Sequence, residues 1–328
     1  MNAYTFTARR AAPLLLSAAL LLGGCALTAA PPLPAVLNIG DTAPEDLTVS
    51  GSTAYVSSIS DGSVIRLDLN RGGAATTFVP AAGDAYRSAW GLRVVPGRNW
   101  LLSIQNQPYD FNPAHARASR LAAYDLGSGA KVASWNLPEG MVGNTVELDP
   151  AGNFYVGDIG PKPRIVRIDP ATGSVTPWAT SPLWQEGGFG IGGMAWGGAG
   201  LYASHNNALW YIGQNPDGSA AAPKPVKIAG DPVIFADGMT WTGGSIIYAE
   251  NDVLVPGAHG SVFQVSFSTP TTAARTLLRT DLRDPSGVAV ATVGGQASVL
   301  VAESQMGFAF GVDQGEPSRP YQIRVFAR

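Results

Sequence analysis

Three residues with oxygen-bearing side chains, Glu45, Asn144 and Asp237, occupy the same position of a repeated sequence pattern. Each stands two residues before a short apolar segment, and the segments are Leu47-Thr-Val, Val146-Glu-Leu and Met239-Thr-Trp. Two carboxylates and an amide oxygen suit a hard divalent cation, with water filling the remaining coordination positions. Taken singly, each residue is also an ordinary turn residue. The shared register predicts a metal site, with Ca²⁺ as the favoured ion.

The repeat that carries these residues has the length of a β-propeller blade. An apolar strand, a turn, an Ala/Tyr-rich strand, a turn and a third strand recur six times. The residues two positions before the six first strands are Glu45, Trp90, Asn144, Gly192, Asp237 and Ser286. Successive residues of this set are 45, 54, 48, 45 and 49 positions apart. Equivalent positions of a propeller converge on one axis. The pattern therefore predicts a ring of these residues around a central channel.

We predict an all-β fold, a six-bladed β-propeller over residues 35–328. The last blade shows only three strands in the sequence, which would leave an unpaired edge. The apolar segment 35–39 is the predicted fourth strand. An N-terminal strand thus completes the last blade and closes the ring.

Composition agrees with this fold class. The 328 residues include 40 Gly and 25 Pro, yet 45% are hydrophobic and only 14% are charged, which is turn-rich rather than disordered. A net charge of −3 without a Lys/Arg cluster argues against nucleic acid as a partner. The single cysteine excludes an internal disulfide.

The N-terminus is typical of an export signal. Arg9 and Arg10 precede a short apolar run, 14–22, and the run ends in Leu22-Gly-Gly-Cys25. This ending resembles the lipobox of bacterial lipoproteins. We therefore predict a signal peptide over 1–24, a lipidated Cys25 with a Pro-rich tether over 25–34, and a lipid-anchored protein of the bacterial cell envelope. A signal peptide without lipidation remains the alternative.

Long loops between second and third strands are predicted to overhang the same mouth of the channel. One loop carries Tyr109 and His115, a second carries His259, and a third spans 304–310. Converging aromatic and imidazole groups would bind a small molecule above the metal. Plain surface loops are the alternative. His205, beside Ser204, forms no recognisable triad in the sequence.

The three ligand positions also resemble a known family. Pro44-Glu45, Asn144 before Val-Glu-Leu-Asp-Pro, and Asp237-Gly-Met are similar to motifs of the regucalcin/gluconolactonase family. The resemblance implies a divalent cation, Ca²⁺ or another, in the channel and hydrolysis of sugar lactones; related paraoxonases hydrolyse lactones and aryl esters. The family's fourth ligand, an Asn, would fall on Gly192. Water or Asp46 could replace it, and Gly192→Asn would be expected to restore it.

Two functions follow from these observations. The first is a metal-dependent hydrolase of lactones or related esters, in which Asp237 activates water. The second is a non-catalytic exported propeller that binds a ligand or a protein, and Gly192 favours it. Whether the chain is an enzyme stays open. We expect a monomer whose partner is a small molecule.

The lipobox reading predicts that Cys25 anchors the protein. Cys25→Ser should release the mature chain from the membrane fraction and remove the acyl mass at its N-terminus, because the lipid is the predicted membrane attachment. Fractionation and intact-mass spectrometry test this. Wild-type protein that is fully soluble and unacylated would refute it.

Overall fold

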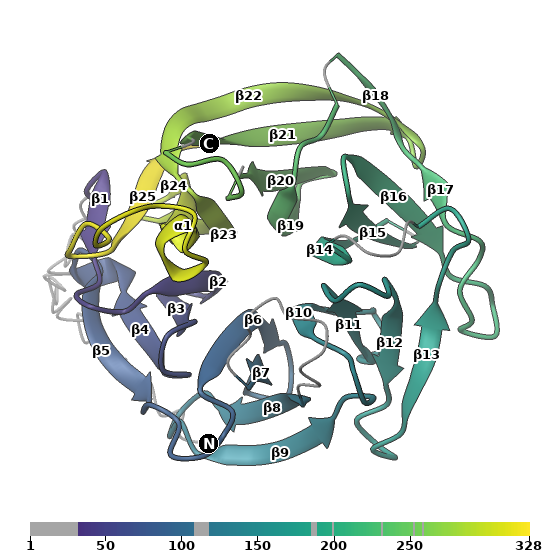
Figure 1. The fold of residues 1–328 in the computed structure, drawn as a ribbon, viewed down its shortest axis with the longest axis horizontal. Helices are drawn as coiled ribbons and strands as arrows, with labels where there is room; N and C mark the ends of the chain where they lie inside the picture. The colour runs from purple at the N-terminus through teal and green to yellow at the C-terminus, as the bar shows by residue number, and fades with distance from the viewer. Residues whose placement is uncertain are drawn as a thin grey trace, which may run out of the picture.

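The computed structural model describes residues 32–107, 118–184, 189–198, 200–230, 232–251, 253–257 and 259–328. Their strands form six sheets arranged around a central axis (Figure 1). Each sheet starts with one strand beside the axis and continues outward through antiparallel neighbours, except that the outermost strand of the fifth blade is parallel to its neighbour. The predicted six-bladed β-propeller is confirmed.

The blades follow one another along the chain. Blade one holds β2 (Pro44–Ser50), β3 (Thr53–Ser58), β4 (Val64–Asp68) and β5 (Ala74–Val79). Blade two holds β6 (Ser88–Val95), β7 (Trp100–Asn106), β8 (Ser119–Asp125) and β9 (Lys131–Asn136). Blade three holds β10 (Gly143–Leu148), β11 (Phe154–Asp158), β12 (Ile165–Ile168) and β13 (Val175–Ala179).

The second half of the ring has outer strands of unequal length, and those of blade five are the longest. Blade four holds β14 (Ile191–Gly197), β15 (Gly200–His205), β16 (Ala208–Gly213) and β17 (Lys224–Pro225). Blade five holds β19 (Ala236–Thr242), β20 (Ser245–Glu250), β21 (His259–Thr269) and β22 (Thr272–Arg283), with β18 (Lys227–Ala229) parallel to β22. Blade six holds β23 (Pro285–Val293), β24 (Gln296–Glu303), β25 (Gln322–Ala327) and β1 (Val36–Asn38). Two short helices, η1 (Leu69–Arg71) and α1 (Met306–Ala309), lie in turns and loops. None of the helices in the described ranges is long and apolar enough to cross a membrane.

Strand β1 closes the ring, as predicted. It pairs antiparallel with β25, with Leu37 opposite Ile323. Further backbone hydrogen bonds extend the seam, from Ile39 N to Tyr321 O at 2.9 Å and from Val325 N to Ala35 O at 2.9 Å. The Leu37 side chain is 2% exposed and belongs to an apolar cluster shared by blades one and six. All six blades and their closing strand therefore lie within residues 36–328.

The inner strands approach one another closely at the axis. A Cβ atom at Gly91 would lie 2.5 Å from the Asn144 carbonyl oxygen, and one at Gly238 would lie 2.5 Å from the Ser286 carbonyl oxygen. Real Cβ atoms do not approach a backbone oxygen so closely, so these positions require glycine. The backbones of adjacent blades thus pack directly around the channel.

The seam makes a testable contribution to stability. Leu37→Ala should lower the free energy of unfolding by about 2–5 kcal/mol, because it opens a cavity in the cluster shared by the first and last blades. Asn38→Ala, at the exposed neighbouring position, is the matched control. Urea unfolding of both variants tests this, and equal midpoints would show that β1 does not hold the ring closed.

Candidate functional site

A β-bulge interrupts the inner strand of every blade close to the predicted register position. The strand pairing shifts between Pro44 and Leu47, Ala89 and Leu92, Gly143 and Thr145, Ile191 and Met194, Ala236 and Met239, and Pro285 and Val288. A bulge adds a residue to one strand and re-aims its side chains. Glu45, Asn144 and Asp237 stand at such bulges, which explains why side chains reach the channel there.

The structure brings these three predicted residues together. Glu45, Asn144 and Asp237 line one small cavity on the axis, between the backbones of Gly193, Gly238 and Gly287. The space inside is roughly 10 Å³, about what one water-sized sphere occupies. These three side chains, up to almost 200 positions apart in the sequence, therefore line the same small space, as the shared register predicts.

The carboxylates in this cavity are electrostatically unfavourable in their charged forms. Glu45 is 4% exposed, and its Oε2 is buried without a hydrogen-bond partner among the described residues. Burial raises the pKa of Glu45 well above its usual range, and the nearby charges of Asp237 and Asp46 raise it further. Burial, followed by the charge of Asp46, raises the pKa of Asp237 to about 7. The cavity thus favours either protons or a cation beside these groups.

Two amides hold their nitrogen atoms toward the protein. Asn251 Nδ2 donates to Asp237 Oδ2 at 3.1 Å and to the Pro285 carbonyl oxygen at 3.2 Å. Asn144 Nδ2 donates to the Gly192 carbonyl oxygen at 2.9 Å. Because the amide nitrogens donate these hydrogen bonds, the amide oxygens of Asn144 and Asn251 are the atoms that could bind a cation. Asn251 directly follows β20 and starts the loop 251–259, which was predicted to overhang the channel mouth, but Asn251 itself was not predicted as a site residue.

Asp46 does not take the place of a missing ligand. Its Oδ1 accepts from Leu47 N at 2.7 Å, and its Oδ2 accepts from Leu92 N of the next blade at 2.7 Å. Burial raises its pKa to about 6, while the bond from Leu92 and the charge of Arg93 lower it. Both oxygens accept hydrogen bonds from backbone amides, and the bond from Leu92 connects blade one to blade two.

Gly192 cannot accept the side chain that the family resemblance expects there. A Cβ atom at Gly192 would lie 2.5 Å from the Ala236 carbonyl oxygen and 2.7 Å from Ser204 Oγ. The expectation that Gly192→Asn simply restores a ligand is therefore wrong, because the neighbouring backbone would have to move. Within the described ranges, no group of three or more His, Cys, Asp or Glu side chains is arranged to hold a metal ion. The axial set instead combines two carboxylates with amides.

A larger pocket opens directly above the small cavity and shares Glu45, Asn144 and Asp237 as its floor. Measured in the same way as the small cavity, its space is about 70 Å³. The walls are mainly apolar and come from four blades and the α1 loop: Trp90, Ile159, Phe189, Phe235, Val253, Met306 and Phe310. The rings of Phe189 and Phe235 meet edge to face at 6.0 Å. Apolar walls above a polar floor are typical of a small-molecule site.

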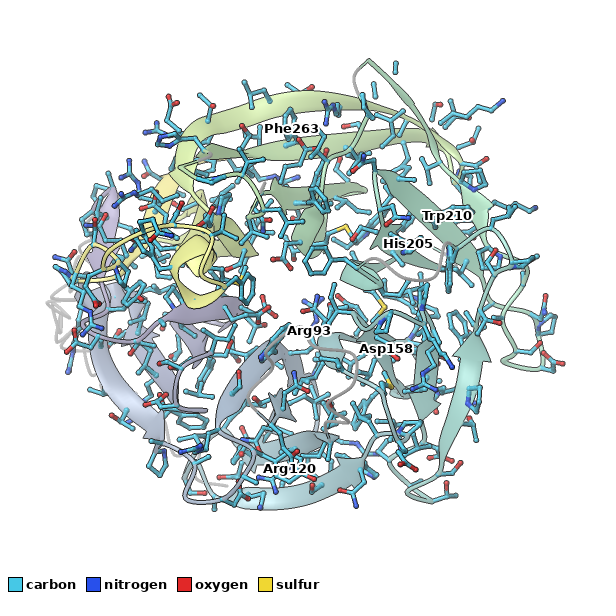
Figure 2. The ribbon with its side chains drawn as sticks, viewed as in Figure 1. Arg93, Arg120, Asp158, His205, Trp210 and Phe263 are labelled. Atoms are coloured by element: carbon cyan, nitrogen blue, oxygen red, sulfur yellow. The ribbon has the colours of Figure 1, made fainter. Side chains whose placement is uncertain are left out.

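His205, at the end of β15, is a wall residue that the sequence did not point to. It is 3% exposed, its Nδ1 lies 3.0 Å from the Gly190 carbonyl oxygen, and its Nε2 lies 3.2 Å from Asn206 Nδ2. A bond to a carbonyl requires a proton on Nδ1, so Nε2 is the acceptor in the neutral ring. Burial lowers the pKa of His205, which favours that neutral form. In Figure 2, His205 lies nearer to the axis than Trp210 of the same blade.

The other predicted site residues are not part of this pocket as described. His259, at the start of β21, lines a separate depression with Arg283, Asp284 and Asp313. Tyr109, His115 and Cys25 lie outside the described residues. Their predicted roles in ligand binding and lipid attachment stay predictions.

No family model matches the chain, and no curated protein matches it. Solved structures do. The Malassezia sympodialis allergen Mala s 1 is 17% identical, with a TM-score of 0.70 over 89% of this chain and 96% of the other. An auxiliary nutrient binding protein from Bacteroides thetaiotaomicron is 12% identical, with a TM-score of 0.62 over 88% and 69%. The β-propeller domain of Cps50 (Swd1) from Myceliophteria thermophila is 14% identical, with a TM-score of 0.51 over 81% and 82%. At these identities the likeness shows the propeller fold alone.

The raised pKa of Asp237 predicts a pH-dependent stability. The folded state binds the Asp237 proton more tightly than the unfolded state does. The resulting contribution to the free energy of unfolding is complete below the unfolded pKa of Asp237, near 3.8, and is lost as the pH rises to about 7. Asp237→Asn removes that loss. In EDTA, the variant should gain up to about 2–3 kcal/mol relative to wild type between pH 5 and pH 8. Urea unfolding at both pH values tests this, and a difference that does not change with pH would contradict it.

Proposed function

We propose that the protein is a divalent-cation-dependent hydrolase of lactones or related esters, acting on a substrate with an apolar group. The supporting observation is Glu45 Oε2, which is buried without a hydrogen-bond partner among the described residues and lines a small cavity with Asp237 at the floor of an apolar pocket. A buried carboxylate oxygen without a partner is costly, and a cation beside it would remove that cost.

The residues at the floor fit a hard cation. Glu45 and Asp237 would supply carboxylate oxygens, and Asn144 and Asn251 would supply amide oxygens, which matches the ligand preference of Ca²⁺. The bound cation would polarise a substrate carbonyl and stabilise negative charge on its oxygen. It would also lower the pKa of both carboxylates, because a positive charge favours their ionised forms.

The chain's own groups would orient the substrate and move the proton. The apolar walls would bind the hydrocarbon part and exclude water from it. Asn251 holds Asp237 Oδ2, so Asp237 Oδ1 is the oxygen proposed to accept a proton from the attacking water. His205 Nε2, in the pocket wall, lies 3.2 Å from Asn206 Nδ2 and accepts its hydrogen bond, so no proton is assigned to it. The assignment to Asp237 does not need the loop that carries Tyr109 and His115.

The apolar walls of the pocket favour substrates with apolar groups. A sugar lactone carries several hydroxyl groups, and walls made of Trp90, Phe189, Phe235 and Phe310 would leave most of them without hydrogen bonds. A lactone or ester with an alkyl or aryl substituent would bury that substituent favourably. We therefore propose apolar lactones or aryl esters rather than sugar lactones.

Non-catalytic ligand binding is the second candidate. The position at Gly192 carries no side chain and has no room for one, so the proposed cation would have fewer protein ligands than the family's site. A cation held this way could orient a bound ligand without activating it. A nutrient-binding protein shares the fold, which is compatible with such a role.

The two candidates predict different results for residues 26–328. Calorimetry should find about one Ca²⁺ bound, with a higher melting temperature than in EDTA. Glu45→Gln should weaken Ca²⁺ binding at least tenfold, because a carboxylate ligand is lost, while the exposed control Glu139→Gln should not. Turnover of alkyl-substituted γ- and δ-lactones and aryl esters should exceed that of glucono-lactone. Asp237→Ala should lower kcat/KM at least 100-fold.

Ca²⁺ binding without turnover would support the ligand-binding candidate. Wild-type protein that binds no divalent ion would overturn the cation site in both candidates.

A further inference from the structure

A second pocket lies at the opposite end of the axial channel. Its walls come from the ends of the inner strands β6, β10, β14 and β19, whereas the carboxylate cavity lies near their starts. Measured in the same way as that cavity, its space is about 440 Å³, a size typical of small-molecule sites. Every lining residue belongs to the described part of the chain. We name it the distal pocket, and its main lining residues are Arg93, Val95, Glu147, Trp196, Thr240 and Trp241.

Blades two and three supply an ion pair on one side of the distal pocket. Arg93 Nη2 pairs with Glu147 Oε1, and the two side chains are 22% and 7% exposed. Each residue stands three positions after the register residue of its blade, Trp90 or Asn144. Arg93 also lies nearer to the axis than Arg120 of the same blade (Figure 2). The repeat that gathers carboxylates at one end of the channel therefore places paired N–H donors and carboxylate oxygens at the other.

Blades four and five supply two tryptophans on the other side. Trp196 and Trp241 each stand four positions after the register residue of their blade, and both are partly exposed. The Trp241 ring stacks on Tyr202, with centroids 5.7 Å apart and planes 10° apart. It also packs directly on the backbone of blade four, because a Cβ atom at Gly197 would lie 2.1 Å from Trp241 Cε3. These contacts fix the indole of Trp241 in the pocket wall.

Hydrogen-bond donors of the distal pocket exceed the acceptors that the protein provides for them. Arg93 Nε and Trp196 Nε1 are buried without a hydrogen-bond partner among the described residues. The guanidinium carries five N–H donors, more than its pairing with Glu147 uses. A hydrocarbon in this pocket would cover the ion pair and supply no hydrogen bond, which costs free energy. The pocket therefore favours a ligand that brings oxygen atoms.

Charge narrows the ligand further. The described residues that line the pocket include one basic side chain, Arg93, and two acidic ones, Glu147 and Asp149. A phosphate ester would meet more like charge than opposite charge, and an organic cation would meet the guanidinium. Neighbouring hydroxyl groups of a neutral ligand avoid both conflicts, because each can accept from Arg93 or donate to Glu147. The C–H face of a sugar ring would pack on an indole, whose face is electron-rich.

We propose that the distal pocket binds a neutral saccharide, with its hydroxyl groups on the Arg93–Glu147 pair and its C–H face on Trp241. This site lies at the far end of the channel from the proposed cation, so the proposal does not rest on hydrolysis or on metal binding. A free sugar and one unit of a polysaccharide present the same chemistry, and the experiment separates them.

Saturation-transfer NMR and calorimetry test the proposal on residues 26–328, which hold all six blades and the closing strand. The probes are glucose, galactose, mannose, N-acetylglucosamine and their disaccharides, in EDTA. At least one should bind, and its phosphate ester should bind no more tightly. Glu147→Gln should weaken binding at least tenfold, because the charged acceptor is lost. Trp241→Ala should weaken it at least tenfold, and Trp241→Phe less, because a smaller ring remains.

The matched control is Glu303→Gln in blade six, which should bind like wild type. The Glu303 side chain is also 7% exposed, and its Oε2 lies 3.9 Å from Arg324 Nη1. Glu147→Gln leaves Arg93 without its counter-charge and is expected to lower the melting temperature. Trp241→Phe keeps the ion pair intact, so it tests the site even where Glu147→Gln fails to fold.

Pull-down with cellulose, chitin and starch granules identifies the source of the saccharide. Polysaccharide binding that is lost in Trp241→Ala, without binding of the small sugars, would support the same chemistry with a chain as the ligand. Absence of binding to every sugar and polysaccharide would overturn the proposal. Trp241 and Glu147 variants that bind like wild type would also overturn it, as would an equal loss of binding in Glu303→Gln.

Discussion

Close contact between the inner strands of adjacent blades is the constraint on which the channel depends. Around the axis, backbone meets backbone, and a Cβ atom at Gly91 or Gly238 would overlap a carbonyl oxygen of the next blade. Side chains can therefore reach the axis only where the inner strand departs from regular pairing. The bulge at the start of each inner strand is that departure. These bulges therefore allow Glu45, Asn144 and Asp237 to direct their side chains into the channel.

The buried carboxylates show how stability and function oppose each other in this channel. Burial raises the pKa values of Glu45, Asp46 and Asp237; the charge of Asp46 raises those of the other two further, and the charge of Asp237 adds to that of Glu45. Hydrogen bonds from two backbone amides offset the cost of burying the Asp46 carboxylate. Glu45 has no such compensation at Oε2. Proteins keep uncompensated polar groups of this kind mainly where a ligand completes them.

The periodic parts of the molecule could be predicted from the sequence because each blade repeats the same local pattern. The register of Glu45, Asn144 and Asp237 was visible for the same reason, and so was the need for β1 to complete blade six. Asn251, His205 and Phe235 could not be found this way. They come from the ends of second strands and from connecting loops, whose direction is set by tertiary packing; Phe235 even has a φ of 37°. Gly192 looked like a position that had lost a ligand, whereas the carbonyl oxygen of Ala236 occupies the space a side chain would need.

The pairing of β1 with β25 has a consequence for how the chain reaches its fold. Val36 lies opposite Arg324, so the first strand to be synthesised waits for the last before its backbone groups are paired. Contacts between such distant residues form slowly, because the ends of a long chain must first meet. Until then, the apolar faces that blades one and six share stay uncovered, and the growing chain is prone to aggregate. Under the predicted export signal, that interval would coincide with passage across a membrane, and ring closure would be completed on the far side.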